Sequence, residues 1–326
     1  MKNVYLIITL SLTLCFLLMP LLAVEKEQTA KNKVSSVGTS SETQKKSGKN
    51  FKVYLPSAKK TVTLSAEEYI MGVVAAEMPA LYHEEALKAQ ALAAYTYAYR
   101  KCLSVSKDAK YQLSADSTID QGYITKAERK KKWGEKFSEY EAKIKKAVLT
   151  VKDRIIVYND EPILAAYHAI SFGNTEDSVN VWQKEYPYLK PVSSIGDLLA
   201  PEYLSEVKIT LSEFKEKIKK LGVTTEAESG AAYIGKAEKS SSGMVLKITI
   251  GDKTFTGAEI RKAFELRSAS FDLSFKDDVF TFSVVGYGHS VGMSQFGADY
   301  MAKQGSGYKE ILEYYYSGCK VKTVTK

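Results

Sequence analysis

The alternation of apolar and polar positions predicts short strands and helices in mixed order along most of the chain. Apolar residues at every second position are typical of half-buried strands, and apolar residues three and four positions apart mark one face of a helix. Because no regular strand–helix–strand rhythm and no internal repeat is present, the pattern predicts an α+β fold of helices and antiparallel hairpins. The predicted elements are a hairpin over 51–64, helices between Ser65 and Pro79 and over 83–102, 128–150, 212–220 and 308–315, a second hairpin of 155–158 with 163–167, and strands over 244–250 and 280–284.

The first 50 residues differ from the rest. Residues 4–24 carry no charge and are long enough to span a hydrocarbon core of ~30 Å as a helix, with Lys2 on the cytoplasmic side. A cleavable signal peptide is the alternative, although 21–23 is an imperfect cleavage site. Residues 25–50 are polar and lack aromatic residues, which predicts a disordered tether. The predicted organisation is a single-pass anchor over 1–24, a linker, and one large domain over 51–326 outside the cytoplasm.

Composition and charge narrow the classes of function. The net charge is +8, but no nucleic-acid-binding motif is present, and the basic run 130–132 lies among glutamates as on a solvated helix face. The charge therefore gives only weak support for an acidic partner, whether nucleic acid or an anionic cell-surface polymer. Three cysteines are too few for a disulfide framework. Three histidines without an HExxH or CxxC pair give no metal site, and we expect no metal or other cofactor.

Glu77 is the sharpest candidate for chemistry. It extends the apolar face of its helix, which carries Ile70, Val73 and Val74, and it lies in the last turn before Pro79. Burial and the negative end of the helix dipole both favour the protonated carboxyl, which a general acid needs near neutral pH. The alternative is a glutamate that reaches solvent or pairs with a neighbouring Arg or Lys.

Two histidines and two serines offer a different chemistry. His168 follows an apolar run, and His289 lies in a glycine-rich segment over 286–297. Each fits a hydrogen-bonded core histidine, which is the commoner role of a lone histidine. A Ser–His–acid hydrolase would need Ser171 or Ser294 as nucleophile, and neither lies in the G-x-S-x-G motif of a nucleophile elbow.

Longer motifs give a resemblance. The stretch EEYIMGVVAAEMPALYHEEALKAQALAAYTYA resembles the signature of the stage II sporulation protein D family, which shares its domain with the amidase enhancers. Further motifs follow in the order of the family and cover nearly all of 51–320. They are YHAISFGNTED at 167–177, VW at 181–182, PYL at 187–189, GYGHSVGMSQFGADYMA at 286–302 and YKEILEYYYSG at 308–318.

The resemblance implies a lytic transglycosylase of peptidoglycan that acts during engulfment of the forespore. Its substrate would be glycan strands from which a partner amidase has removed the stem peptides, and a membrane scaffold protein is a second expected partner. The glutamate of the E-M-P motif would be catalytic. By position in the motifs, the implied site residues are Glu77 as the catalytic acid/base, with Lys88, Thr175, Tyr188, His168 and Ser171 in substrate binding.

Two departures from the family pattern affect the expected site. Tyr95 replaces an arginine that the family commonly has, and Arg100, about one helical turn later, is a candidate substitute. Some members hold zinc with a cysteine and a histidine, where this chain has Ser114 and Ile119. We therefore expect this chain to lack that zinc.

A lytic transglycosylase needs only one carboxyl group. Glu77 would protonate the glycosidic oxygen and then accept the proton of the muramoyl C6 hydroxyl, which attacks C1 of the same sugar. Two rival functions stay open: a hydrolase that pairs Glu77 with Asp116 or Asp120, and a non-enzymatic glycan-binding module that stimulates an amidase. Strands without stem peptides carry free lactyl carboxylates, for which Lys88 is the expected partner.

Overall fold

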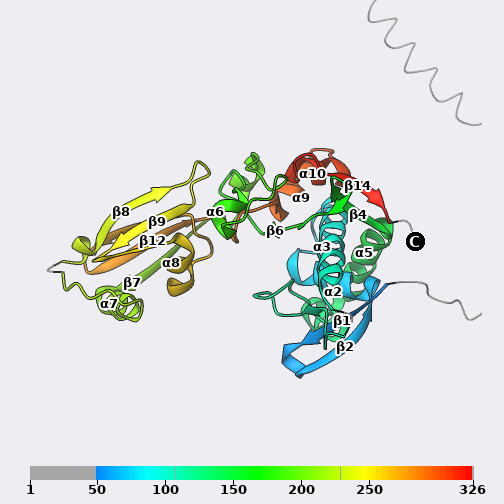
Figure 1. Cartoon of the computed structure of the whole chain (residues 1–326), viewed down its shortest axis with the longest axis horizontal. Helices are drawn as coiled ribbons and strands as arrows, with labels where there is room; N and C mark the ends of the chain where they lie inside the picture. Colours follow the sequence, from blue (N-terminus) through cyan, green and yellow to red (C-terminus); the bar gives the residue numbers. More distant parts are fainter. Residues whose placement is uncertain (1–48, 107, 228, 325–326) are drawn as a thin grey trace, which may run out of the picture. The chain divides into compact units, whose positions relative to one another are not determined.

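The computed structural model describes residues 49–324 except residues 107 and 228, all within one compact unit. The anchor predicted over 1–24 and nearly all of the tether predicted over 25–50 lie outside the described residues. Within the described part, no helix has the length and apolar character needed to cross a bilayer. The predicted α+β class is confirmed, because helices are interspersed with several small and mostly antiparallel sheets (Figure 1).

Most predicted helices and strands are present. The helices of the described part are α2 (Ala66–Glu77), α3 (Glu84–Ser104), α4 (Lys126–Trp133), α5 (Phe137–Thr150), α6 (Ser178–Trp182), α7 (Leu211–Lys220), α8 (Gly257–Phe264), α9 (Gln295–Lys303) and α10 (Tyr308–Tyr315), with short 3-10 turns η2 (Pro56–Ala58), η3 (Gly134–Lys136), η4 (Ile195–Leu199) and η5 (Gly230–Tyr233). The strands are β1 (Asn50–Leu55), β2 (Lys60–Ser65), β3 (Leu113–Ser114), β4 (Arg154–Tyr158), β5 (Glu161–Pro162), β6 (Tyr167–His168), β7 (Leu204–Thr210), β8 (Ile234–Lys239), β9 (Val245–Ile250), β10 (Lys253–Phe255), β11 (Phe271–Lys276), β12 (Val279–Val285), β13 (Met293–Ser294) and β14 (Lys320–Thr323).

A first hydrophobic core forms around three helices. α2, α3 and α5 contact one another and stand side by side (Figure 1). The small-residue face of α3, with Ala86, Ala89 and Ala93 fully buried, lets neighbouring elements approach closely. The sheets β2-β1-β3 and β14-β4-β5 and the helices α9 and α10 complete this core.

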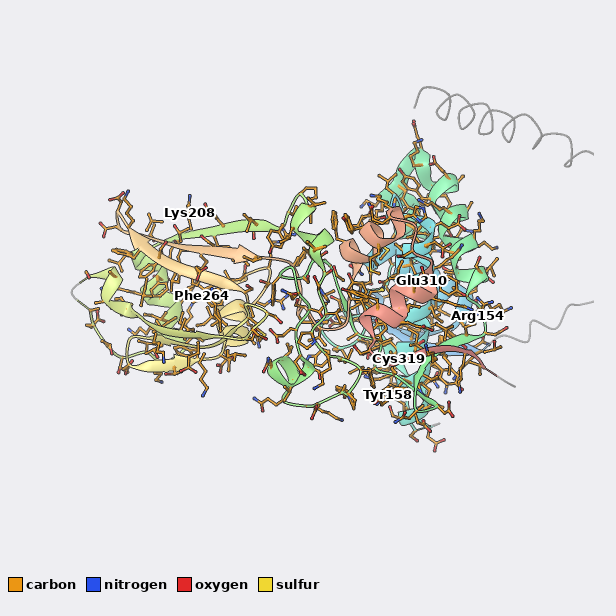
Figure 2. All side chains as sticks on the ribbon, turned by 90° about the horizontal axis from the view of Figure 1, so that it is seen from above. Arg154, Tyr158, Lys208, Phe264, Glu310 and Cys319 are labelled. Carbon is orange, nitrogen blue, oxygen red and sulfur yellow. The ribbon has the colours of Figure 1, made fainter. Side chains whose placement is uncertain are left out.

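A second core lies in residues 204–285. The antiparallel sheets β11-β12-β7 and β10-β9-β8 share it with α7 and α8. Phenylalanines dominate its packing: the rings of Phe214 and Phe280 stack with centroids 3.7 Å apart, and Phe264 lies 5.4 Å from Phe214. Figure 2 labels Phe264, which belongs to this second core, and Cys319, which belongs to the first. The part of the chain for which the sequence predicts one mixed domain therefore contains two separate hydrophobic cores.

One predicted strand is largely missing. The hairpin partner of β4 is β5, and of the predicted strand 163–167 only Tyr167 is in a strand, β6. Pro162 has no N–H for a ladder, and the N–H of Ile163 makes one last bond to the β4 strand, to the carbonyl of Ile156 at 3.1 Å, before the chain turns away. The N–H of Leu164 donates to the hydroxyl of Tyr188, at 2.9 Å. Residues 164–166 thereby become part of a cavity wall.

The two ends of α2 form largely as predicted. The Ser65 hydroxyl accepts a hydrogen bond from the N–H of Glu68 at 3.2 Å, and Met78 after the helix is extended at φ −125° and ψ 138°. A full capping box would also need the Glu68 side chain to accept from the N–H of Ser65, but Glu68 makes another contact. The Glu68 carboxylate binds the guanidinium of Arg129 at 2.9 Å, which ties α4 to the start of α2. At its other end α2 stops at Glu77, because Pro79 disfavours a helical conformation at Met78.

Candidate active site

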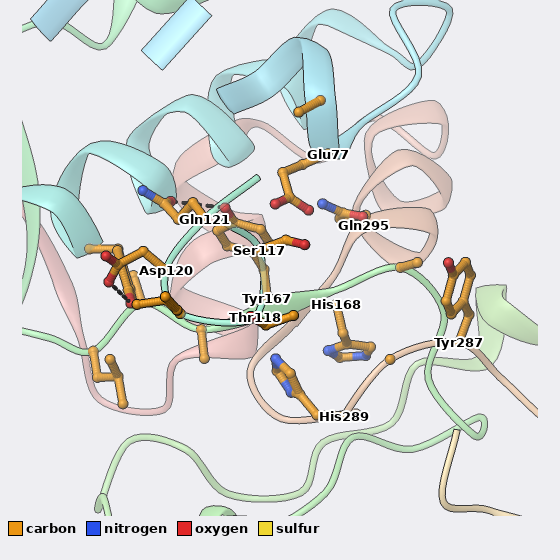
Figure 3. Close-up of a pocket in the computed structure, with 18 of the residues that line it drawn as sticks. Glu77, Ser117, Thr118, Asp120, Gln121, Tyr167, His168, Tyr287, His289 and Gln295 are labelled. Carbon is orange, nitrogen blue, oxygen red and sulfur yellow. Dashed lines mark hydrogen bonds between the residues drawn. The ribbon is translucent and has the colours of Figure 1, made fainter. Parts of the chain in front are cut away.

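A cavity of about 750 Å³ opens at the C-terminal end of α2 (Figure 3). Its size falls in the range of ~300–1,000 Å³ that is usual for pockets binding small molecules. The walls come from α2 and α3, the segments 117–121, 164–169 and 287–289, and single residues of α6, α8 and α9. Segments far apart in the sequence therefore meet at this site.

Glu77 lies in the wall of this cavity and points its carboxyl group inward (Figure 3). Its Oε1 accepts a hydrogen bond from the N–H of Gly122 at 2.6 Å. Burial raises the pKa of Glu77 above its ordinary value, while the Gly122 N–H and the nearby Lys132 ammonium oppose that rise. Desolvation is the larger effect, so the pKa of Glu77 shifts upward, which is the direction expected from the sequence.

Lys132 is held close to Glu77 by the main chain of α2. Its ammonium group donates to the carbonyl of Ala75 at 2.8 Å, and burial lowers its pKa although Glu77 raises it. Lys132 is not itself a lining residue of the cavity. Its positive charge therefore acts on Glu77, and lowers the pKa of that carboxyl group, from outside the cavity lining.

The two other candidate carboxylates are engaged elsewhere. Asp120 lines the cavity, but its Oδ1 accepts from the Tyr97 hydroxyl at 3.0 Å and pairs with Lys101 at 2.8 Å. Its Oδ2 accepts from the N–H of Ser114 at 2.9 Å. Asp116 accepts hydrogen bonds within its own turn at 2.6 and 2.9 Å and is not a lining residue. Glu77 is thus the lining carboxyl group with the fewest internal partners.

His168 and His289 are neighbours in the cavity wall, with ring centroids 5.7 Å apart. Nδ1 of His168 lies 3.2 Å from the carbonyl of Val291, and its buried Nε2 has no hydrogen-bond partner among the described residues. Burial lowers the pKa of His168 to about 4 and that of His289 to about 3. Both rings are therefore neutral at neutral pH, and Nε2 of His168 is a buried acceptor without a partner among the described residues.

Lys88 and Tyr188, predicted to bind substrate, do not line the cavity. The Lys88 ammonium pairs with Glu85 at 2.7 Å and Glu84 at 3.1 Å, all in the first turns of α3. Tyr188 is buried, and its hydroxyl accepts from the N–H of the lining residue Leu164 at 2.9 Å. Tyr188 thus supports the cavity wall indirectly, through its hydrogen bond to the main chain of Leu164.

Thr175 and Ser171 are both completely buried and also lie outside the lining. The Thr175 hydroxyl accepts from the N–H of Val192 at 2.9 Å. The N–H of Ser171 donates to Asp197 at 2.9 Å. The Ser294 hydroxyl also donates to Asp197, at 2.8 Å, so no Ser–His pair forms at this acid in the described chain. Of the six residues predicted for the site, the structure brings Glu77 and His168 to the cavity.

Several lining residues had no predicted role. Trp182 and Tyr287 are aromatic, 37% and 45% exposed, and the indole of Trp182 lies 5.3 Å from the ring of His289. Among the described residues that line the cavity, Arg261 of α8 is the only Lys or Arg. The exposure of two aromatic side chains is a tertiary property, although both residues stand in the motifs 181–182 and 286–302.

The two departures from the family pattern lie as follows. Tyr95 packs against the ring of Phe51 at 6.3 Å, and Arg100 donates to the carbonyl of Pro162, so neither brings a cation to the cavity. Ser114 accepts from a main-chain N–H at 3.1 Å, and Ile119 is 57% exposed in the cavity wall. In the ranges that the structure describes, no three His, Cys, Asp or Glu side chains gather as a metal site.

Known proteins resemble this chain over most of its length. The profile of the family described as "SpoIID: Stage II sporulation protein" matches residues 55–158. Stage II sporulation protein D of Bacillus subtilis (strain 168) is 40% identical over 306 residues, which cover 92% of this chain and 86% of that protein. The protein of the same name from Bacillus amyloliquefaciens is 36% identical, covering 86% and 80%. The amidase enhancer of Bacillus subtilis (strain 168) is 29% identical, covering 76% of this chain and 39% of that protein.

Proposed function

We propose that this chain, which belongs to the stage II sporulation protein D family, is a sporulation enzyme that cleaves peptidoglycan glycan strands as a lytic transglycosylase. The bond cut is that between N-acetylmuramic acid and N-acetylglucosamine, and the product is a 1,6-anhydro end. The observation that carries the proposal is Glu77, a half-buried carboxyl group that faces a cavity of about 750 Å³ with a raised pKa.

In this reaction Glu77 acts twice. Its protonated carboxyl group gives a proton to the glycosidic oxygen as the bond to C1 of muramic acid breaks. The resulting carboxylate takes the proton of the C6 hydroxyl while that oxygen bonds to C1, which restores the acid and consumes no water. Gly122 holds Oε1 at 2.6 Å, and no hydrogen bond from the described residues occupies Oε2. Oε2 is therefore the oxygen that can transfer the proton.

A hydrolase with two carboxyl groups fits the site less well. Such enzymes need a second carboxylate that is free to activate water or to attack the sugar. Both oxygens of Asp120 already accept hydrogen bonds or an ion pair, and Asp116 bonds within its own turn. A single acid/base with an intramolecular nucleophile requires only Glu77.

The cavity also has the surfaces that a sugar chain needs. Trp182 and Tyr287 offer exposed aromatic rings, on which the apolar faces of pyranose rings can pack. Gln121 and Gln295 present amides in the wall, and the Oε1 of Gln121 is oriented by the Tyr167 hydroxyl at 2.8 Å. Polar groups that are fixed in this way favour a hydroxyl-rich ligand over an apolar one.

The place of action follows from the substrate. Peptidoglycan lies outside the cytoplasm, and we propose that the apolar stretch 4–24 anchors the enzyme in the cell membrane with its folded part on that side. A peptidoglycan amidase and a membrane scaffold protein are the proposed partners.

Product analysis tests the proposal directly. Purified protein is incubated with glycan strands freed of stem peptides, and the products are identified by mass spectrometry. We expect 1,6-anhydromuramic ends from the wild type, and a rate at least about a hundredfold lower from Glu77→Gln, which keeps shape but cannot transfer the proton. Reducing ends that carry an added water, together with inactivity of Asp120→Asn, would instead support the hydrolase.

A second candidate function comes from the similarity to an amidase enhancer. As a glycan-binding stimulator, the protein would raise the activity of an amidase without cutting glycan itself. The same Glu77→Gln variant separates the two functions, because stimulation by binding does not need a proton donor. Full stimulation by this variant, with no glycan cleavage by the wild type, would favour the second function.

A further inference from the structure

The cavity contains a cation without an internal partner. Arg261 lines the wall from α8, and its Nε donates to the carbonyl of Leu266 at 3.3 Å. In the described part of the chain, no carboxylate forms a salt bridge with its guanidinium, and its charge interacts with Tyr287 and His289. A half-buried guanidinium without a counter-ion is unfavourable, so the site is prepared for an anion.

The acids of the same cavity are not that counter-ion. Asp120 is paired with Lys101 at 2.8 Å. The cation that acts on Glu77 is Lys132, behind the wall, and not Arg261. The charge of Arg261 acts instead on His289, which stays neutral and does not compete for an anion. The cavity thus separates a proton donor at Glu77 from a positive site beside His289.

We infer that Arg261 binds the free lactyl carboxylate of a muramic acid in the strand and thereby selects strands without stem peptides. The inference rests on the proposed function, and it assigns to Arg261 the role for which the sequence suggested Lys88. Lys88 is already paired with two glutamates and lies outside the cavity. A guanidinium can hold a carboxylate through two parallel N–H donors.

The chemistry of the strand explains the selection. In intact peptidoglycan the lactyl carboxyl group is an amide, which has no charge and carries a bulky peptide. Once the peptide is removed, the carboxylate gains a charge-assisted hydrogen bond with Arg261.

A binding experiment tests this without catalysis. The full folded chain with Glu77→Gln is titrated calorimetrically with two matched tetrasaccharides of N-acetylglucosamine and N-acetylmuramic acid. One has free lactyl carboxylates, and the other has each lactyl group capped as a methylamide. We expect the free acid to bind about tenfold more tightly or better, since a charge-assisted hydrogen bond is typically worth that factor.

Arg261→Gln in the same background should abolish this preference and leave the affinity for the methylamide within about twofold. Arg261→Lys should retain part of the preference. The matched control is Lys217→Gln. The Lys217 ammonium also bonds to a carbonyl at the end of α8, that of Ala263 at 3.1 Å, but lies outside the cavity, so this change should keep the full preference.

Three outcomes would overturn the inference: equal affinity of the starting protein for both ligands, a preference that survives Arg261→Gln, and an equal loss of affinity for both ligands in Arg261→Gln. The last would show that Arg261 only supports the fold of α8. Failure of the proposed function looks different. In that case the wild type makes no 1,6-anhydro ends, while the carboxylate preference and its dependence on Arg261 are unaffected.

Discussion

The N–H of Gly122 donates a 2.6 Å hydrogen bond to Oε1 of Glu77, and a methyl group on Gly122 would lie 2.8 Å from that same oxygen. Glycine at 122 thus lets the main chain come close enough to hold the carboxyl group in one position. The segment that follows α3 in the sequence in this way fixes a residue at the end of α2.

Gly122→Ala should therefore impair catalysis more than folding. The end of the Glu77 side chain can move away from the added methyl group, so we expect a loss of stability below about 1 kcal/mol. The displaced carboxyl group would no longer meet the glycosidic oxygen, and we expect at least about a tenfold decrease in glycan cleavage. Thermal unfolding and initial rates measured on the same preparation check both parts. An unchanged rate would show that the Gly122 contact does not position Glu77.

Glu77→Gln should raise stability at neutral pH. The pKa of Glu77 is raised by burial above its ordinary value of 4.5. A carboxyl group with a raised folded pKa contributes stability that is fully present below 4.5 and is lost as the pH rises through the folded pKa. Glutamine avoids this loss, so the variant should gain on the wild type as the pH increases through that window. Chemical denaturation at several pH values measures the difference, and a gap that is constant with pH would refute the raised pKa.

The two cavity histidines should make the protein sensitive to acid. Their pKa values are lowered to about 4 for His168 and about 3 for His289 from an ordinary value of 6.5. Their contribution to stability is present above pH 6.5 and is lost as the pH falls toward those values. NMR titration of the imidazole protons should show neutral rings down to about pH 5. His289→Asn should weaken the dependence of stability on pH between 6.5 and 4, and a ring that titrates near 6.5 would contradict the prediction.

Arg129 should be a strong determinant of stability. Its side chain is fully buried and pairs with Glu141 at 2.8 Å and Glu68 at 2.9 Å. Arg129→Ala would leave those two carboxylates without their cation, and we expect a loss of about 3 kcal/mol or more. The matched control is Lys136→Ala. The partner of Lys136, Glu139, is exposed, as is Lys136 itself, so this change should alter the free energy of unfolding little. Equal effects of the two changes, measured in urea, would contradict this reading of Arg129.

The sequence by itself determined the local structure around Glu77 and the order of most elements. Ser65 caps α2 and Pro79 ends it, because a side-chain acceptor and a missing N–H act over a few residues. Periodicity likewise predicted α3, α7 and α10, whereas the single helix predicted over 128–150 is divided at Gly134 into α4 and α5. The continuous apolar face of α2 placed Glu77 where burial raises its pKa.

Tertiary structure alone decided which residues share the cavity. Arg261 comes from α8, whose apolar side chains belong to the second core. It shares the cavity wall with Trp182 of α6 and with His289, which come from other parts of the chain. No local rule encodes such contacts. The same holds for Lys88, whose charge looked available in the sequence but is taken up by Glu84 and Glu85 one helical turn away. A side chain becomes free or occupied only when packing has fixed its neighbours, and that is why the positive site of the cavity could not be read from the sequence.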